Sequence, residues 1–187
     1  MGFCMADTKI MDAKGISRSL ERMAHEILET NQGAADLAII GVRTRGAYLA
    51  ERLVKMIKRI EKIAPPVGAV DITMYRDDVQ IRLEQPIIQN TDIEFSIDDK
   101  NVILVDDVLY TGRTVRAALN EIADYGRPRC IQLAVLIDRG HRELPIRADY
   151  VGIQLQTFHG ENVIVKLKEK DGEDSVILQQ MNGGKKK

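Results

Sequence analysis

Two adjacent acids, Asp106 and Asp107, directly follow four apolar residues at positions 102–105. An uninterrupted apolar run of this length is typical of a central parallel strand that is buried on both faces. A loop containing Thr111 and Gly112 comes next and leads into a helical pattern. A strand end followed by a small-residue loop and a helix N-terminus is where open α/β sheets bind phosphorylated ligands.

The acids and the loop place opposite demands on a ligand. Backbone N–H groups at the helix start, with the hydroxyls of Thr111 and Thr114, suit a phosphate dianion, which Asp106 and Asp107 would repel. A phosphorylated ribose reconciles the two, because its 5′-phosphate takes the loop while its 2′- and 3′-hydroxyls donate hydrogen bonds to the carboxylates. The sequence contains neither a Walker A loop nor the dinucleotide fingerprint G-x-G-x-x-G. From the spacing alone, an ordinary turn with exposed acids is the alternative.

A second strand–loop–helix unit is predicted from a buried strand at 37–42 and a helix at 47–60. The loop between them is basic and consists of Arg43, Thr44, Arg45 and Gly46. Two arginines around a threonine suit a pyrophosphate group, and two exposed arginines in an ordinary loop are the alternative interpretation.

A third buried strand is predicted at 130–137, and it ends in a polar segment at 138–145. Strands that alternate with helices indicate the α/β class, with a central, mostly parallel sheet flanked by helices. On such a sheet the three polar loops should lie along one edge, and this convergence is stronger evidence for a site than any single loop.

The rest of the chain predicts the elements around this sheet. Apolar residues recur at helical spacing over 16–31, and residues 67–75 alternate like a strand. Residues 76–90 are charged and aperiodic, which makes them a candidate lid. Residues 162–178 predict a β-hairpin that turns at Asp171 and Gly172. We expect one domain over residues 1–182 and a disordered basic tail at 183–187.

Composition limits the class of protein. The chain has 187 residues, of which 29% are charged and 44% hydrophobic, as in a soluble globular domain. The net charge is −1, so nucleic-acid binding would need a local basic patch. Cys4 and Cys130 lack metal-site spacing and fit a reducing compartment. With no apolar signal core and no apolar run of membrane-spanning length, we expect a cytoplasmic protein with no membrane partner.

The string V-I-L-V-D-D-V-L-Y-T-G-R-T resembles the phosphoribosyl pyrophosphate (PRPP) motif of the type I phosphoribosyltransferases. Two further segments, V-D-I-T-M-Y-R-D-D and D-R-G-H-R-E-L-P-I-R-A-D-Y, occur in an order and spacing that resemble the PyrR family. The resemblance extends from about Ile16 to the C-terminal hairpin. Members of that family are uracil phosphoribosyltransferases that also bind pyrimidine-operon messenger RNA and regulate its attenuation.

The resemblance implies the type I phosphoribosyltransferase fold with a small hood, and the reaction of uracil with PRPP to give UMP and pyrophosphate. It assigns catalytic roles to Asp106, Asp107 and Arg76. It assigns the 5′-phosphate of PRPP to Tyr110, Thr111, Gly112, Arg113 and Thr114. The pyrophosphate loop would be Arg43, Thr44, Arg45 and Gly46. A flexible loop would begin at Tyr75, Arg76 and Asp77, and the uracil or UMP hood would be Asp138, Arg139 and Gly140. Mg²⁺ would arrive with PRPP near Asp106 and Asp107, without an all-protein cage.

One departure from other type I enzymes bears on the substrate. Enzymes that act on 6-oxopurines carry an acid where Tyr110 stands, and a tyrosine is no carboxylate base at neutral pH. The resemblance therefore disfavours purine substrates, and it identifies no general base for uracil. Orotate phosphoribosyltransferase is a weaker alternative, because the hood segment differs from what that enzyme carries.

RNA binding is a second function that the resemblance implies. The candidate basic face consists of Arg18, His25, His141, Arg142 and Arg147. Glu21 lies among the helix cations, and Ile153 stands where RNA-binding relatives tend to carry lysine, so an enzyme without RNA regulation is the alternative. For His141 alone, an exposed loop histidine without function is an equal interpretation. The family also implies a homodimer or a larger homo-oligomer.

Overall fold

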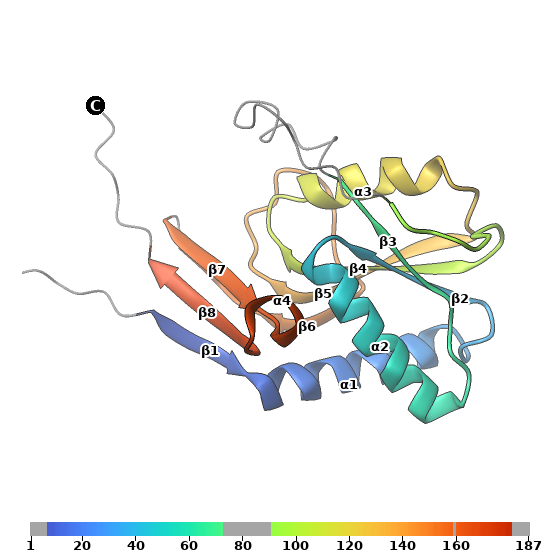
Figure 1. Cartoon of the computed structure of the whole chain (residues 1–187). Coiled ribbons are helices and arrows are strands. Elements are labelled where there is room, and N and C mark those ends of the chain that lie inside the picture. Colours follow the sequence, from blue (N-terminus) through green and yellow to red (C-terminus); the bar gives the residue numbers. More distant parts are fainter. Residues whose placement is uncertain (1–6, 73–90, 159, 181–187) are drawn as a thin grey trace, which may run out of the picture.

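The computed structural model describes residues 7–72, 91–158 and 160–180 (Figure 1). The predicted lid, the flexible-loop residues Tyr75, Arg76 and Asp77, and the C-terminal tail lie outside the described residues. In the described part of the chain, none of the helices is long and apolar enough to cross a bilayer.

A five-stranded parallel sheet forms the centre of the molecule, in the order β3-β2-β4-β5-β6. Its strands are β2 (Leu37–Val42), β3 (Val67–Val70), β4 (Asn101–Leu109), β5 (Cys130–Asp138) and β6 (Tyr150–Gln154). The middle strand is β4, where Val105 pairs with Gly41 of β2 and with Ala134 of β5. This confirms the predicted α/β class and the parallel central sheet.

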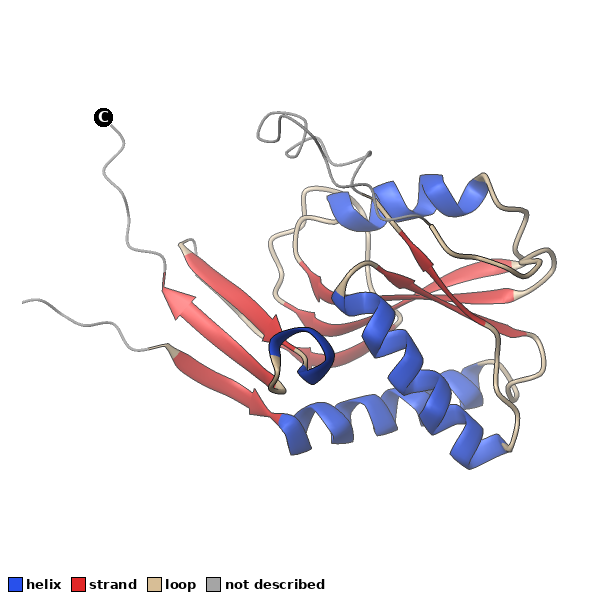
Figure 2. Cartoon of the chain, in the orientation of Figure 1, coloured by secondary structure: helices blue, strands red, loops and turns tan. Residues whose placement is uncertain are grey.

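Helices cover both faces of the sheet, as Figure 2 shows. Helices α1 (Ala13–Thr30) and α2 (Arg45–Glu61) pack on one face, and α3 (Arg113–Ala123) packs on the other. Alternate residues of β4 enter the two hydrophobic cores: Ile103 and Val105 face α1 and α2, while Val102 and Leu104 face α3. The apolar run at 102–105 is therefore buried on both sides, as its pattern predicts.

A second, antiparallel sheet lies beside the central one and has the order β1-β8-β7. It contains β1 (Thr8–Asp12), β7 (Glu161–Lys166) and β8 (Ser175–Gln180), with the short helix α4 (Lys168–Asp171) between β7 and β8. The predicted hairpin is confirmed, and its turn ends at Gly172 in the left-handed region (φ 78°). Strand β1 has no local sequence signal, because its partner β8 lies more than 160 residues away in the chain.

Two boundaries differ from the predictions in a way that matters for the site. Strand β4 continues to Leu109, which pairs with Asp138, so Asp106 and Asp107 belong to the strand and not to the loop after it. Helix α2 begins at Arg45, so the basic loop is shorter and Arg45 already lies in the first helical turn. Strand β6 was not predicted, and its carboxyl end adds a fourth segment to the edge that carries the three polar loops.

Candidate active site

The two acids lie at the carboxyl end of β4 and are held by the backbone around them. Asp106 is 5% exposed, and its Oδ1 accepts a hydrogen bond from the N–H of Asp107 at 2.9 Å. Oδ1 of Asp107 accepts one from the N–H of Val108, also at 2.9 Å. Burial raises the pKa of the Asp107 carboxyl, while the hydrogen bond with Asp106 and the charge of Arg45 act in the opposite direction. A site with this pair attracts a cation or hydroxyl donors.

The basic loop lies against the acids because two glycines let the chains approach. A Cβ on Gly46 would stand 2.4 Å from the carbonyl oxygen of Val105, and one on Gly41 would stand 2.4 Å from the Cα of Ala47. No other residue type fits at either place without moving backbone. The sequence thereby fixes the start of α2 directly beside the strand that carries Asp106.

The same loop offers unused hydrogen-bond donors. Helix α2 has no acidic residue in its first turn, and its N-cap, Thr44, makes no side-chain capping bond. The Nε atom of Arg43 is buried without a hydrogen-bond partner among the described residues. Free N–H groups at a helix start and an unsatisfied guanidinium both favour an anion.

The loop after β4 provides a second, nearly neutral anion site at the start of α3. Its N-cap, Gly112, has φ 93° and makes no side-chain capping bond, and the first turn of α3 carries no acid. The N–H of Arg113 donates to the hydroxyl of Thr111 at 3.4 Å, while the Arg113 side chain pairs with Glu143 at 2.8 Å. The N–H groups of Glu143 and Leu144 donate to the carbonyl of Thr111, which fastens this loop to the segment after β5.

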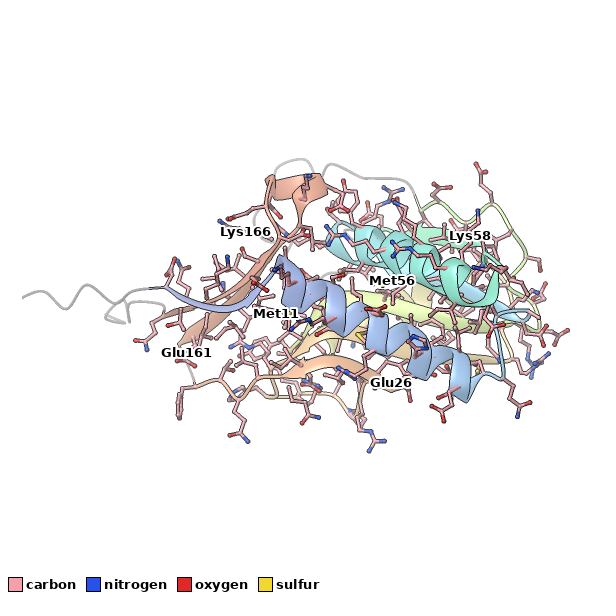
Figure 3. The ribbon with its side chains drawn as sticks, turned by 90° about the horizontal axis from the view of Figure 1, so that it is seen from below. Met11, Glu26, Met56, Lys58, Glu161 and Lys166 are labelled. Carbon is pink, nitrogen blue, oxygen red and sulfur yellow. The ribbon has the colours of Figure 1, made fainter. Side chains whose placement is uncertain are left out.

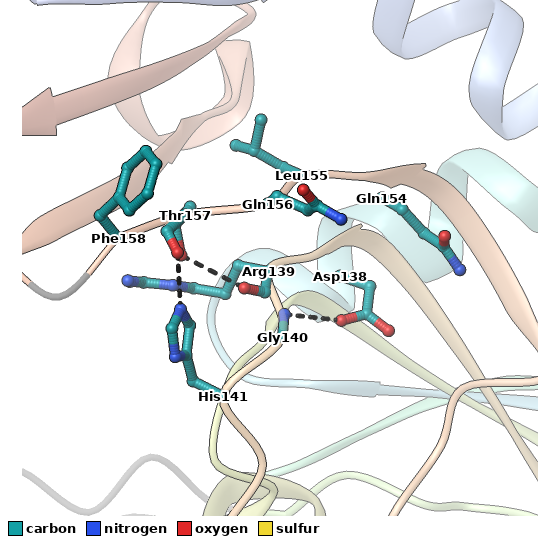
Figure 4. Close-up of a pocket in the computed structure, with 9 residues that line it drawn as sticks. All are labelled: Asp138, Arg139, Gly140, His141, Gln154, Leu155, Gln156, Thr157 and Phe158. Atoms are coloured by element: carbon teal, nitrogen blue, oxygen red, sulfur yellow. Dashed lines mark hydrogen bonds between the residues drawn. The ribbon is translucent and has the colours of Figure 1, made fainter.

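A cavity of about 440 Å³ opens next to these loops, between the end of β5 and the segment after β6. Figure 4 shows its lining residues, Asp138, Arg139, Gly140, His141, Gln154, Leu155, Gln156, Thr157 and Phe158. His141 lies with Nε2 2.7 Å from the carbonyl of Thr157, and the hydroxyl of Thr157 donates to the carbonyl of Arg139 (Figure 4). The Phe158 ring is 78% exposed. Amide groups and an exposed aromatic ring beside one cavity suit a small planar polar ring.

Arg139 connects the cavity to the loop after β4. Its guanidinium lies over the Tyr110 ring, 4.1 Å from the centroid, and its Nη2 donates to the carbonyl of Glu161 at 2.7 Å. The Arg139 residue is only 6% exposed, and its Nε has no hydrogen-bond partner among the described residues. This stack restrains the Tyr110 ring.

Arg142, which was predicted to bind RNA, makes several contacts within the protein. Its guanidinium donates to the carbonyls of Leu109, Tyr110, Gly140 and Ile146 at 2.7–3.3 Å. It also pairs with Asp138 at 2.6 Å. A guanidinium has five N–H donors, and these contacts involve all three of its nitrogen atoms. Arg142 therefore joins the loop after β4 to the segment after β5.

The other predicted RNA-binding residues, Arg18, His25, His141 and Arg147, are exposed. Helix α1 lies along strand β6 at the edge of the sheet, where Arg22 donates to the carbonyls of Val151 and Gly152 at 2.8 and 2.7 Å. Arg22 also pairs with Glu26. Glu21 is exposed on the same helix as Arg18 and His25.

One part of the site was missed from the sequence. The segment from Gln154 to Phe158 lines the cavity, yet no residue in it was predicted to contact a ligand. The signal was present in the short alternating run that forms β6, because the carboxyl end of any parallel strand in this sheet reaches the same edge. Recognition of β6 as a strand would have predicted a fourth polar segment at this edge of the sheet.

The site residues do not form a metal cage by themselves. Among the residues that the structure describes, no three of His, Cys, Asp and Glu gather closely enough to hold a metal ion. The adjacent carboxylates of Asp106 and Asp107 are nevertheless hard oxygen ligands, which suit a magnesium ion that is held mainly by phosphate oxygens.

Comparisons with known proteins decide the family. The model of the phosphoribosyl transferase domain matches residues 7–170. The bifunctional protein PyrR of Pelotomaculum thermopropionicum is 58% identical over 170 residues, which cover 91% of this chain and 94% of that protein. The chain belongs to the PyrR family. The bifunctional protein PyrR of Deinococcus radiodurans is 59% identical over 169 residues, which cover 90% of this chain and 92% of that protein. The one of Enterococcus faecalis is 51% identical over 178 residues, which cover 95% of this chain and 99% of that protein.

Solved structures show that this chain has the type I phosphoribosyltransferase fold. A hypoxanthine-guanine phosphoribosyltransferase from Bacillus anthracis superposes with a TM-score of 0.68 at 18% identity, covering 95% of this chain and all of the other. A hypoxanthine phosphoribosyltransferase of Trypanosoma cruzi gives 0.72 at 17% identity, covering 96% and 94%. At these identities the likeness establishes the fold and not the base. The fold and the family thus agree with the resemblance carried by the sequence motifs.

Proposed function

We propose that this chain is a uracil phosphoribosyltransferase, which converts uracil and PRPP to UMP and pyrophosphate, and that it also regulates pyrimidine genes through UMP-dependent binding of their leader RNA. One observation carries the enzymatic part: two anion sites, a pair of acids and a planar-ring cavity lie along one edge of one sheet. Membership of a family whose relatives are named bifunctional supports the two-part proposal. We place this activity in the cytoplasm and expect a homodimer or larger homo-oligomer.

The roles follow from charge and position. Residues 110–114 take the 5′-phosphate, because that loop offers N–H groups and hydroxyls at a helix start. Asp106 and Asp107 accept hydrogen bonds from the ribose hydroxyls. Arg43, Thr44, Arg45 and Gly46 take the pyrophosphate, which leaves with more charge than any other part of the substrate. Asp138, Arg139 and Gly140 border the cavity for uracil.

The C1′ carbon becomes cation-like as pyrophosphate departs. Cationic groups near the leaving group lower that barrier, and the exclusion of water prevents hydrolysis of the cation-like centre. Asp106 and Asp107 would hold a Mg²⁺ ion that arrives with PRPP, and the ion would supply further positive charge there. The lid role of Arg76 stays a prediction, since that residue lies outside the described residues.

A base panel tests the enzymatic part. Purified protein with Mg²⁺ and PRPP should form UMP from uracil and should leave hypoxanthine unchanged, because Tyr110 replaces the acid that contacts purine nitrogens. Orotate should also be a poor substrate. Turnover of a purine at a rate comparable to uracil would refute the assignment of the cavity.

A titration with the native leader RNA, with and without UMP, tests the regulatory part. We expect saturable binding at physiological salt that UMP tightens, and by linkage RNA must tighten UMP binding by the same factor. The enzyme-only alternative predicts uracil turnover with no UMP-sensitive RNA binding.

A further inference from the structure

One of the contacts between helix α2 and the C-terminal hairpin falls on the basic loop. Arg45 donates from Nε to Oδ2 of Asp171 at 3.2 Å and from Nη2 to Oδ1 at 2.9 Å. Asp171 ends α4, in the hairpin of the second sheet, 126 residues further along the chain. Side-by-side pairing of a guanidinium with a carboxylate fixes the plane of the arginine as well as its position.

The hairpin that carries Asp171 is itself held in place. Oδ2 of Asp171 accepts a hydrogen bond from the N–H of Leu167 at 2.9 Å. Two turns along α2 from Arg45, Arg52 makes four hydrogen bonds of 2.6–2.9 Å to Glu169 and Asp174. Figures 1 and 3 both place α4 beside the N-terminal end of α2. The carboxylate that pairs with Arg45 therefore lies on an element that other hydrogen bonds hold in place.

The pairing leaves part of Arg45 available. Asp171 occupies the Nε and Nη2 edge, whereas Nη1 has no hydrogen bond to a described residue. The charge of the same guanidinium also lowers the pKa of Asp107, against the effect of burial. A long arginine side chain held in this way loses less conformational entropy when it meets an anion, since its rotamer is already fixed.

We propose that Asp171 is a positioning residue for pyrophosphate, which holds Arg45 so that its remaining donors meet the leaving group of PRPP. This proposal rests on the proposed function, because it takes the loop from Arg43 to Gly46 as the pyrophosphate site. The C-terminal hairpin would then take part in substrate binding, by holding the arginine that meets pyrophosphate.

A double-mutant cycle tests this dependence without relying on turnover. The variants are Arg45→Ala, Asp171→Ala and the double variant, and calorimetry measures the dissociation constants of pyrophosphate and PRPP, each with Mg²⁺. We expect Asp171→Ala to weaken pyrophosphate binding about three- to tenfold in the wild-type background. In the Arg45→Ala background, the same change should have no effect, since the group that Asp171 positions is absent.

Two companion variants separate positioning from a loss of folding. Asp171→Asn retains an oxygen for the N–H of Leu167 and removes the charge, so it should weaken binding nearly as much as alanine with an unchanged melting temperature. Glu173→Gln is the matched control, because this acid lies on the same turn but pairs with Lys166 at 2.8 Å. It should leave both dissociation constants unchanged. In steady-state kinetics, the Asp171 variants should lower kcat as well as raise the KM for PRPP, because Arg45 belongs to the loop that meets the leaving group, and they should leave the KM for uracil unaltered.

The outcomes are distinguishable. Additive losses in the cycle, or wild-type pyrophosphate binding in Asp171→Asn, would overturn the positioning role alone. Tighter pyrophosphate binding in Asp171→Ala would also overturn it, because Asp171 would then compete with the ligand. A wild-type protein that binds neither Mg²⁺-pyrophosphate nor Mg²⁺-PRPP would overturn the proposed function as well.

Discussion

Helices α2 and α3 begin at the same edge of one sheet, yet the loops before them are built differently. Both helices start without a side-chain cap and without an acid in the first turn. The α2 loop carries two arginines, rests on Val105 through Gly46, and is paired with the hairpin through Asp171. The α3 loop has Thr111, Gly112 and Thr114, and its arginine, Arg113, is paired with Glu143. It is fastened by backbone hydrogen bonds from Glu143 and Leu144 to Thr111.

This difference matches what each loop would have to do. A 5′-phosphate keeps its charge throughout the reaction, so backbone N–H groups and hydroxyls are enough to hold it. Pyrophosphate gains charge as its bond to C1′ breaks, and fixed cations stabilise that change more than neutral donors do. The charged loop is therefore expected to govern the rate, and the neutral loop to govern ground-state binding.

The largest expected effect comes from adding a side chain at Gly46, where the charged loop packs closely against strand β4. In Gly46→Ala, the new Cβ would meet the Val105 carbonyl at 2.4 Å, so the loop must shift. We expect a loss of about 1–3 kcal/mol in the free energy of unfolding and at least about a hundredfold loss in kcat/KM. Gly172→Ala is the control: its φ of 78° strains an alanine backbone, but nothing lies within 4 Å of the added carbon, so activity should persist.

Removal of the charge on Asp107 should have the next largest effect. Asp107→Asn takes a charge-assisted acceptor from the ribose, a bond that contributes about 1.5–3 kcal/mol, so we expect kcat/KM to fall about ten- to a hundredfold. Kinetics like those of the wild type, in a folded variant, would remove Asp107 from the site.

Stability should change in the opposite direction. Burial raises the pKa of Asp107 in the folded state, so folding loses stability as pH rises from the unfolded pKa to the folded one, and the loss persists at neutral pH. Asp107→Asn should therefore melt at a higher temperature than the wild type at pH 7, and the difference should vanish below the ordinary aspartate pKa. Thermal melts across that pH range measure the effect, and an equal melting temperature at all pH values would contradict it.

A matched pair of substitutions tests the comparison of the two loops directly. Arg43→Gln removes a cation from the α2 loop and should lower kcat about tenfold or more, whereas Thr114→Ala removes a neutral donor from the α3 loop. The threonine variant should mainly raise the KM for PRPP, by about two- to tenfold, with kcat little altered. If Thr114→Ala depresses kcat more than Arg43→Gln does, the division between rate and binding is wrong.

The sequence predicted the central sheet and the edge that carries the site, because buried parallel strands and helix periodicity are local patterns. It did not predict β1 and β6: a five-residue strand takes its identity from its partner. The pairing of Arg45 with Asp171 joins residues 126 positions apart, so no spacing rule reveals it. The contacts of Arg142 within the protein were not predicted either. An arginine in a polar loop has the same sequence signature whether it faces solvent or donates to four carbonyls.

Arg147 gives the smallest expected effect, and its contrast with Arg142 separates the two functions. Arg147 is exposed, so Arg147→Ala should leave uracil turnover and the melting temperature unchanged. If it contacts single-stranded leader RNA, its loss should reduce the salt dependence of binding by about 0.7 log unit per log unit of salt. Arg142→Ala should instead lower both stability and turnover, because it removes the contacts that join the segment after β5 to the loop after β4.

Glu21 provides the control for this RNA prediction. It is exposed on the same helix as Arg18 and His25, where a carboxylate repels phosphate. Glu21→Thr should therefore strengthen leader binding without any change in turnover, by a factor that shrinks as salt is raised. If Glu21→Thr and Arg147→Ala both leave RNA affinity unchanged at low salt, the candidate basic face is not the RNA surface. The two anion loops at the sheet edge would then be the chain's only proposed phosphate sites.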